Sequence, residues 1–107
     1  MLFNGCLKFI RQAEASINNH DIPGANTCII RAQDIICELK TTLDMSYPIA
    51  KSLSQLYDYI NRRLIDANIA KSTDILEEVL DLVTELRDAW AEVVKHKPLR
   101  YAAGRGI

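Results

Sequence analysis

The sequence predicts an all-α protein, an antiparallel four-helix bundle with short loops. Apolar residues recur every three or four positions along nearly the whole chain, and no stretch alternates apolar with polar residues as a half-buried strand would. The chain has only 4 glycines and 3 prolines, too few for the many turns of a β-sandwich or barrel. Four amphipathic segments joined by short polar breaks therefore favour a bundle around one core.

The first two predicted helices are separated by a polar break that ends at Asp21. The first helix runs to about Asn18 and carries one apolar face: Phe3, Cys6, Leu7, Ile10, Ala13 and Ile17. Asp21 precedes Ile22 and Pro23, which predicts a capping side chain with proline in the first turn of the second helix. The second helix carries a longer apolar face: Ala25, Cys28, Ile29, Ala32, Ile35, Ile36, Leu39 and Leu43.

Two further breaks delimit the third and fourth helices. After a break at 44–47, the third helix is expected to have Ser46 as its cap and Pro48 in its first turn. Its apolar face comprises Ile49, Leu53, Leu56, Ile60, Leu64 and Ala67. After a break at 70–73, Asp74 and Glu77 resemble a capping box. The fourth helix carries Leu76, Val79, Val83, Leu86, Trp90 and Val94, and is expected to end at Pro98.

Length and composition predict one domain over residues 1–97, followed by a flexible basic tail at 98–107. A chain of 107 residues with 49% apolar and 25% charged residues is typical of one folded domain rather than a disordered protein. The net charge of −1 gives no electrostatic basis for nucleic-acid binding. No apolar run is long enough to span a membrane, and no signal-peptide cleavage site is present. These features predict a cytoplasmic protein that neither binds nucleic acid nor inserts into a membrane.

The residues that catalysis or metal binding would require do not occur at suitable spacings. The odd set of Cys6, Cys28 and Cys37 has no CxxC pair, and His20 and His96 complete no metal-ligand pattern with it. No glutamate has a histidine three residues later, and no glycine-rich phosphate loop occurs. We therefore expect no catalytic residue, no metal and no cofactor. Basic residues near the end of the chain leave RNA contact as a weak alternative, because cations also favour helix C-termini.

An uncharged strip on the second helix is a candidate binding surface. Away from the core face lie Asn26, Ile30, Gln33, Cys37 and Thr41. Such a strip suits both the apolar side chains and the backbone of an amphipathic helix or extended peptide. Tyr59 on the third helix also stands away from the core stripe, and Ile65 and Ile69 stand further round. Isolated apolar residues are common on protein surfaces, so an ordinary solvated surface is an equally good interpretation.

On the fourth helix, carboxylates form a solvated stripe opposite the apolar face: Glu78, Asp81, Glu85, Asp88 and Glu92.

Three segments resemble the flagellin-specific secretion chaperones. LFNGCLKFIRQA resembles their opening LYDGALRFL-x-x-A, and LYDYINRRLIDANI resembles their segment LYxYxxxRLxxAN. The fourth helix, with DILEEV followed by LRDAW, resembles their closing pattern L-x-E-V … LRxAW. The similarity runs from Leu2 to Trp90, in order and at matching spacing. Members of this family usually begin earlier, with a flexible arm, so we expect a first helix truncated at its N-terminus.

The resemblance implies a cytoplasmic chaperone that binds the disordered C-terminal segment of flagellin, prevents its premature polymerisation and assists its secretion. Carried over by position, it marks candidate flagellin-binding residues on the third helix: Leu56, Tyr57, Tyr59, Arg63, Leu64 and Asn68. Ile30, Gln33 and Cys37 are candidates from the strip on the second helix, while Leu56 and Leu64 fit the core equally well. Other flagellar export or regulatory proteins are further possible partners. The alternative is a structural or regulatory bundle that acts by self-association, because an incomplete first helix would leave apolar surface for a homodimer.

Overall fold

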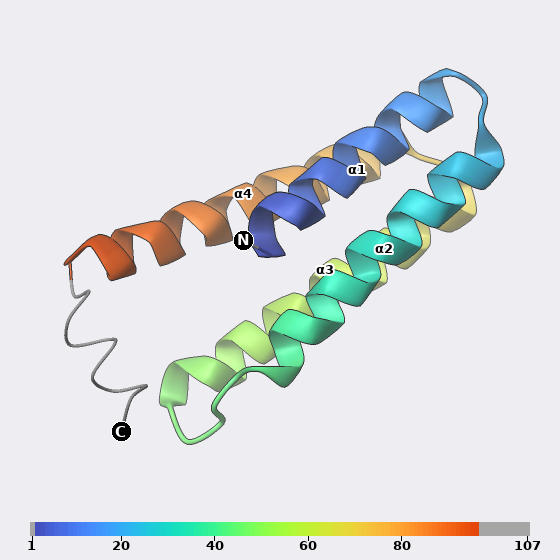
Figure 1. Cartoon of the computed structure of the whole chain (residues 1–107). Coiled ribbons are helices and arrows are strands. Elements are labelled where there is room, and N and C mark those ends of the chain that lie inside the picture. Colours follow the sequence, from blue (N-terminus) through green and yellow to red (C-terminus); the bar gives the residue numbers. More distant parts are fainter. Residues whose placement is uncertain (1, 97–107) are drawn as a thin grey trace.

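The computed structural model describes residues 2–96 as four helices with short connections (Figure 1). The helices are α1 (Leu2–Asn18), α2 (Ile22–Thr41), α3 (Pro48–Ala70) and α4 (Thr73–His96). No strand occurs among these residues, which confirms the expected all-α bundle. The predicted tail at 98–107 and the predicted helix end at Pro98 lie outside the described residues. None of the described helices is both long and apolar enough to cross a membrane.

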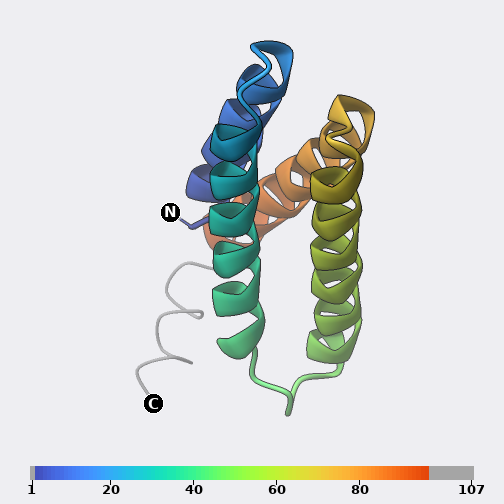
Figure 2. The ribbon, with the colours of Figure 1, turned by 90° about the vertical axis from the view of Figure 1, so that its right-hand side faces the viewer.

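Successive helices run antiparallel and close into a ring. Helix α1 packs against α2 and α4, and α3 packs against the same two helices. In Figure 1, α1 and α4 form one layer and α2 and α3 form the other. The two layers converge at the end that holds the α1–α2 and α3–α4 connections, and they separate towards the other end. Figure 2 shows the consequence, in which the second half of α4 runs away from α3.

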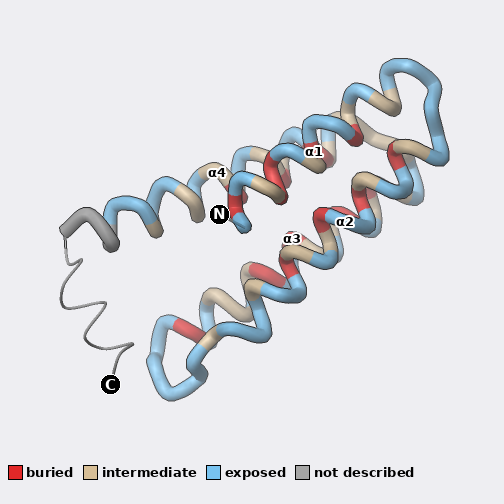
Figure 3. Tube along the Cα trace, viewed as in Figure 1, coloured by how far each residue is buried: buried red, intermediate tan, exposed pale blue. Residues whose placement is uncertain are grey.

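The core is formed by the faces that the periodicity predicts. Figure 3 shows the buried positions on the inner sides of the helices. The core cluster contains Phe3, Cys6, Leu7, Ile10, Ala13, Ile29, Ala32, Ile36, Tyr57, Ile60, Leu64, Ala67, Leu76, Val79 and Val83. One predicted core residue, Ile49, is instead 64% exposed. It lies in the first turn of α3, at the end of the molecule where the layers have separated.

Small side chains bring α1 and α2 close together. The contact includes Cys6 and Ala13 from α1, and Ala25 and Ala32 from α2, all fully buried. The Cys6 Sγ lies 3.9 Å from the carbonyl oxygen of Ala32. A Cβ atom added at Gly5 would lie 3.4 Å from Cδ1 of Ile35. Large residues at these positions would force the two helices apart, since interiors are packed without spare volume.

The helix starts confirm one predicted cap and correct two. The Gly24 N–H donates to Asp21 Oδ1 at 3.0 Å, so Asp21 caps α2 as expected. Ser46 does not cap α3: its hydroxyl donates to Asp44, and the capping position is held by Tyr47, whose side chain makes no capping bond. The start of α4 also differs from the prediction.

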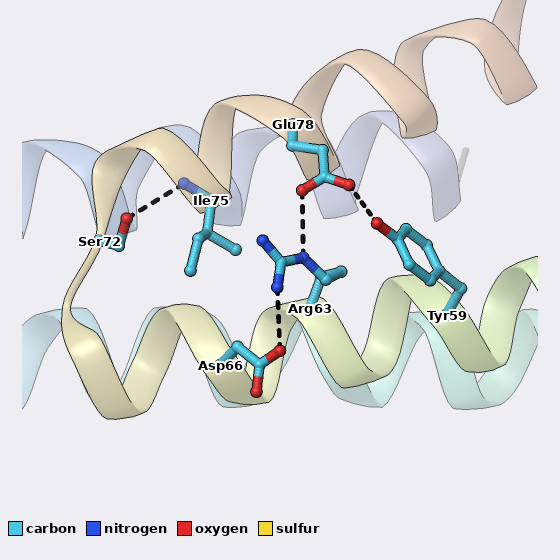
Figure 4. Close-up of polar contacts among 6 residues, drawn as sticks. All are labelled: Tyr59, Arg63, Asp66, Ser72, Ile75 and Glu78. Atoms are coloured by element: carbon cyan, nitrogen blue, oxygen red, sulfur yellow. Dashed lines mark hydrogen bonds and ion pairs between the residues drawn. The ribbon is translucent and has the colours of Figure 1, made fainter.

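Helix α4 begins one residue before Asp74, which therefore lies inside its first turn. The Ile75 N–H donates to the Ser72 hydroxyl oxygen at 3.2 Å (Figure 4), so Ser72 is the cap. The prediction of Asp74 was wrong because aspartate and serine are similarly good caps and stand two residues apart in this sequence. Only the backbone geometry distinguishes them.

Two helix ends use a left-handed residue that is not glycine. His20, after α1, has φ 59° and Lys71, after α3, has φ 50°. Each allows the chain to turn sharply while its N–H still bonds a carbonyl of the preceding helix, Ile17 for His20 and Ala67 for Lys71. Both helices thus stop without the glycine that usually occupies this position.

Candidate functional site

The structure distributes the candidate residues over three regions. Gln33 and Asn68 lie in the α2–α3 contact, and Tyr59 and Arg63 lie in the α3–α4 contact. Ile30 and Cys37 are exposed residues of α2 that stand three before and four after Gln33. Tyr57 and Leu64 belong to the core, and Leu56 is half-buried against it. The candidates therefore do not form one continuous surface.

Paired polar side chains link α2 to α3. Asn68 Nδ2 donates to Asn26 Oδ1 at 2.7 Å, and Gln33 Nε2 donates to Asn61 Oδ1 at 3.1 Å. Asn26 and Gln33 are seven residues apart on α2, and their partners Asn68 and Asn61 are seven residues apart on α3 in the opposite order. This is the pattern expected for antiparallel helices. The amides of Asn26 and Gln33 are thus used within the bundle. The uncharged strip is in part a contact with α3, which revises its interpretation as a surface wholly available to a partner.

Beside these amide pairs, exposed apolar side chains form what we call the α2–α3 face, consisting of Ile30, Cys37, Ile65 and Ile69. The register of the amide pairs places Ile30 level with Ile65 across the contact. Ile30 is 45% exposed, Ile65 42% and Ile69 80%, and Cys37 is also exposed. The face consists of positions that helical angles place outside the core stripes, and none of them is charged. It is the part of the candidate site that a partner can reach directly.

Tyr59 and Arg63 bond to one carboxylate of α4, and we call Tyr59, Arg63 and Glu78 the α3–α4 clamp. The Tyr59 hydroxyl donates to Glu78 Oε2, and Arg63 Nε donates to Glu78 Oε1 at 3.1 Å (Figure 4). Arg63 Nη1 also donates to Asp66 Oδ2 at 3.1 Å. The hydrogen bond from Tyr59, followed by Arg63, lowers the pKa of Glu78, and the same bond to Glu78 raises the pKa of Tyr59. The motif residues of α3 and α4 therefore contact each other.

Tyr57 and Leu64 lie inside the bundle. Tyr57 is 5% exposed and Leu64 is fully buried, on the same face of α3 as Ile60. Burial raises the pKa of the Tyr57 phenol. A partner could touch these side chains only if the helices moved apart, so their role in binding stays a prediction.

Within residues 2–96, no group of three or more histidine, cysteine, aspartate or glutamate side chains is placed to hold a metal ion. The cysteines are free, with Cys6 buried, Cys28 half-buried and Cys37 exposed. Burial raises the pKa of the Cys6 thiol to about 12, which keeps it protonated and unreactive.

Comparison with known proteins gives a consistent result. The family model described as flagellar protein FliS matches residues 1–97. The flagellar secretion chaperone FliS of Bacillus subtilis (strain 168) is 46% identical over 95 residues, which cover 89% of this chain and 71% of that protein. The proteins of the same name from Salmonella typhimurium and Vibrio cholerae are 33% and 30% identical, over 87% of this chain and 71% and 70% of their own lengths. The chain belongs to the FliS family of flagellar proteins.

Proposed function

We propose that this protein is a cytoplasmic, non-catalytic chaperone that binds the C-terminal segment of flagellin, prevents premature polymerisation and assists secretion. The family match over residues 1–97 carries the proposal, because the relatives are named flagellar secretion chaperones. Other flagellar export or regulatory proteins are further partners that such a role would accommodate.

The α2–α3 face supports this function physically. Ile30, Ile65 and Ile69 expose apolar surface, and none of the residues of the face is charged. The exposed Lys40–Asp58 ion pair, which also links α2 to α3, places charges at the border of the face. An amphipathic segment that is unfolded before assembly can cover this face with its own apolar side. Ordering that segment opposes binding, which limits affinity and permits release at the export apparatus.

The test is titration of the protein with a flagellin C-terminal peptide. We expect one peptide per protein, a gain in helicity by circular dichroism, and a negative heat-capacity change by calorimetry, because apolar surface becomes buried. A heat-capacity change near zero would contradict binding through the α2–α3 face.

A matched pair of variants separates the face from the core. Ile30→Asp should weaken peptide binding and leave the bundle folded, since the side chain is already exposed. Ile36→Asp, on the same helix, should unfold the protein, since an unpaired buried carboxylate costs several kcal/mol, comparable with the whole stability. If Ile30→Asp binds the peptide as tightly as the unchanged protein, this face is not the binding surface.

The second candidate function is self-association as a homodimer. It is favoured by further exposed apolar residues at the α2–α3 turn, Met45, Tyr47 and Ile49. Sizing chromatography distinguishes the two functions. A dimer that persists unchanged when peptide is added supports self-association, whereas a complex of one protein with one peptide supports the chaperone function.

A further inference from the structure

Up to Glu92, where the structure describes burial, the fully buried residues of α4 lie in its first half: Leu76, Val79 and Val83. Leu86 and Trp90, further along, are half-buried and pack against the core. In Figure 3 the turns of α4 that follow its buried positions are intermediate or exposed as far as they are described, and in Figure 2 they have left the side of α3. The second half is linked to α1, since Arg87 Nη1 donates to Asn4 Oδ1 at 3.2 Å, whereas the described polar contacts of α4 with α3 lie in the first half.

The α3–α4 clamp lies within that first half. Glu78 stands between Leu76 and Val79 in sequence and uses one carboxylate oxygen for Tyr59 and the other for Arg63. Asp66 bonds another nitrogen of Arg63, so the guanidinium is held from both sides. An isolated exposed ion pair contributes little, but two hydrogen bonds that share one carboxylate restrain its geometry. These contacts join α4 to α3 at two successive turns of α3, at Tyr59 and Arg63.

We propose that Glu78 is a positioning residue that, by holding Tyr59 and Arg63, sets the angle at which α4 leaves α3. Tyr59 and Arg63 then influence a bound partner through the position of α4 instead of by touching it. This consequence for the partner rests on the proposed function, whereas the clamp itself does not.

The first experiment compares Glu78→Gln with the matched control Glu85→Gln, which removes an exposed carboxylate two turns later on the same helix. Trp90 is the only tryptophan of the chain and reports on the second half of α4. We expect Glu78→Gln to lower Tm and to increase acrylamide quenching of Trp90. The control should leave both quantities unchanged. If Trp90 in Glu78→Gln behaves as in the control, Glu78 does not set the angle, whatever happens to Tm.

A second experiment tests whether Glu78 acts through Tyr59. Tyr59→Phe removes only the hydroxyl that bonds to Glu78, so its effects on Tm and on Trp90 should largely disappear in the Glu78→Gln background. Absorbance titration, with Tyr59→Phe subtracted to isolate one phenol, should show the Tyr59 pKa falling in Glu78→Gln, because the carboxylate bond raises it. Fully additive effects, or an unchanged Tyr59 pKa, would overturn the clamp.

The effect of the clamp on partner binding is tested by measuring the dissociation constant of the flagellin C-terminal peptide. Arg63→Gln should weaken binding several-fold in the unchanged protein and have little further effect in the Glu78→Gln background. An equal weakening in both backgrounds would mean that Arg63 touches the peptide, and no weakening in either would mean that the clamp does not affect it. If the unchanged protein does not bind the peptide, the proposed function is contradicted. The role of the clamp is still tested by Tm and by acrylamide quenching of Trp90.

Discussion

At the scale of single residues, the cysteines differ in how far reagents can reach them. Cys37 is exposed on the α2–α3 face, whereas Cys6 is buried with a pKa raised to about 12. We expect a thiol reagent at pH 8 to modify Cys37 rapidly and Cys6 only when the protein unfolds, since the thiolate is the reactive form. Mass spectrometry of the modified peptides gives both rates. Bound flagellin peptide should protect Cys37, and unchanged labelling at saturation would contradict contact at that end of the face.

His20 holds a backbone conformation that costs free energy. Its φ of 59° is unfavourable for a residue with a Cβ atom and natural for glycine. His20→Gly should therefore raise the free energy of unfolding by about 1 kcal/mol, as measured by urea denaturation. Asn19→Gly is the control, because Asn19 is not among the described residues with positive φ. An equal gain at Asn19 would show that backbone strain at His20 is not the cause.

At the scale of elements, the α1–α4 contact contains an unfavourable pair of carboxyl groups. Arg87 Nη1 donates to Asn4 Oδ1 at 3.2 Å, which sets the antiparallel register of the two helices. The same register brings Glu14 level with Glu77. Burial, followed by hydrogen bonding and repulsion from Glu77, raises the pKa of Glu14 to about 7, and Arg11 opposes this shift.

This pair predicts that stability falls as the pH rises. The folded protein holds the Glu14 proton more tightly than the unfolded chain does, so the favourable contribution is complete below about pH 4.5 and is lost by about pH 7. Glu14→Gln should raise Tm at pH 8 and leave it nearly unchanged at pH 4. Glu38→Gln, an exposed carboxylate on α2, is the control. A gain of equal size at both pH values would contradict the shared proton as the cause.

The helices and their breaks could be predicted from the sequence, but the helix starts only in part. Asp21 stands two residues before Pro23, and this combination correctly identified Asp21 as the cap of α2. Ser46 and Asp74 were predicted as caps, but neighbouring residues hold the capping positions, Tyr47 for α3 and Ser72 for α4. Which residue becomes the cap depends on the backbone turn before the helix, and the sequence does not specify that turn. Tyr57 is not part of the apolar face predicted for the third helix and entered only through the family resemblance, whereas in the structure it lies in the core and is 5% exposed.

At the scale of the whole molecule, the sequence predicts which candidate residues lie outside the core. It does not predict how those residues are arranged on the surface of the bundle. Helical angles place Ile30 and Tyr59 outside the core stripe, and both are exposed. The angles cannot tell which neighbouring helix a side chain will meet. That choice depends on the order of the helices around the bundle, which puts Gln33 against α3 and Arg63 against α4.

The close contact of α1 and α2 has a consequence for the order in which the chain folds. These helices are adjacent in sequence, joined by a short capped turn, and packed through small side chains such as Ala13 and Ala32. Contacts between neighbouring segments close short loops and form early, whereas the contact of α1 with α4 must close most of the chain. We expect the α1–α2 hairpin to be the folding nucleus, with α4 docking last.

Stopped-flow kinetics in urea can measure this order. Ala32→Gly in the hairpin should mainly slow folding, and Val83→Ala in α4 should mainly speed unfolding. The reverse pattern would place the nucleus at α4. If the hairpin does form first, the first half of the protein acquires its structure before the helix that completes the ring, and α4 remains the segment most easily released from the native state.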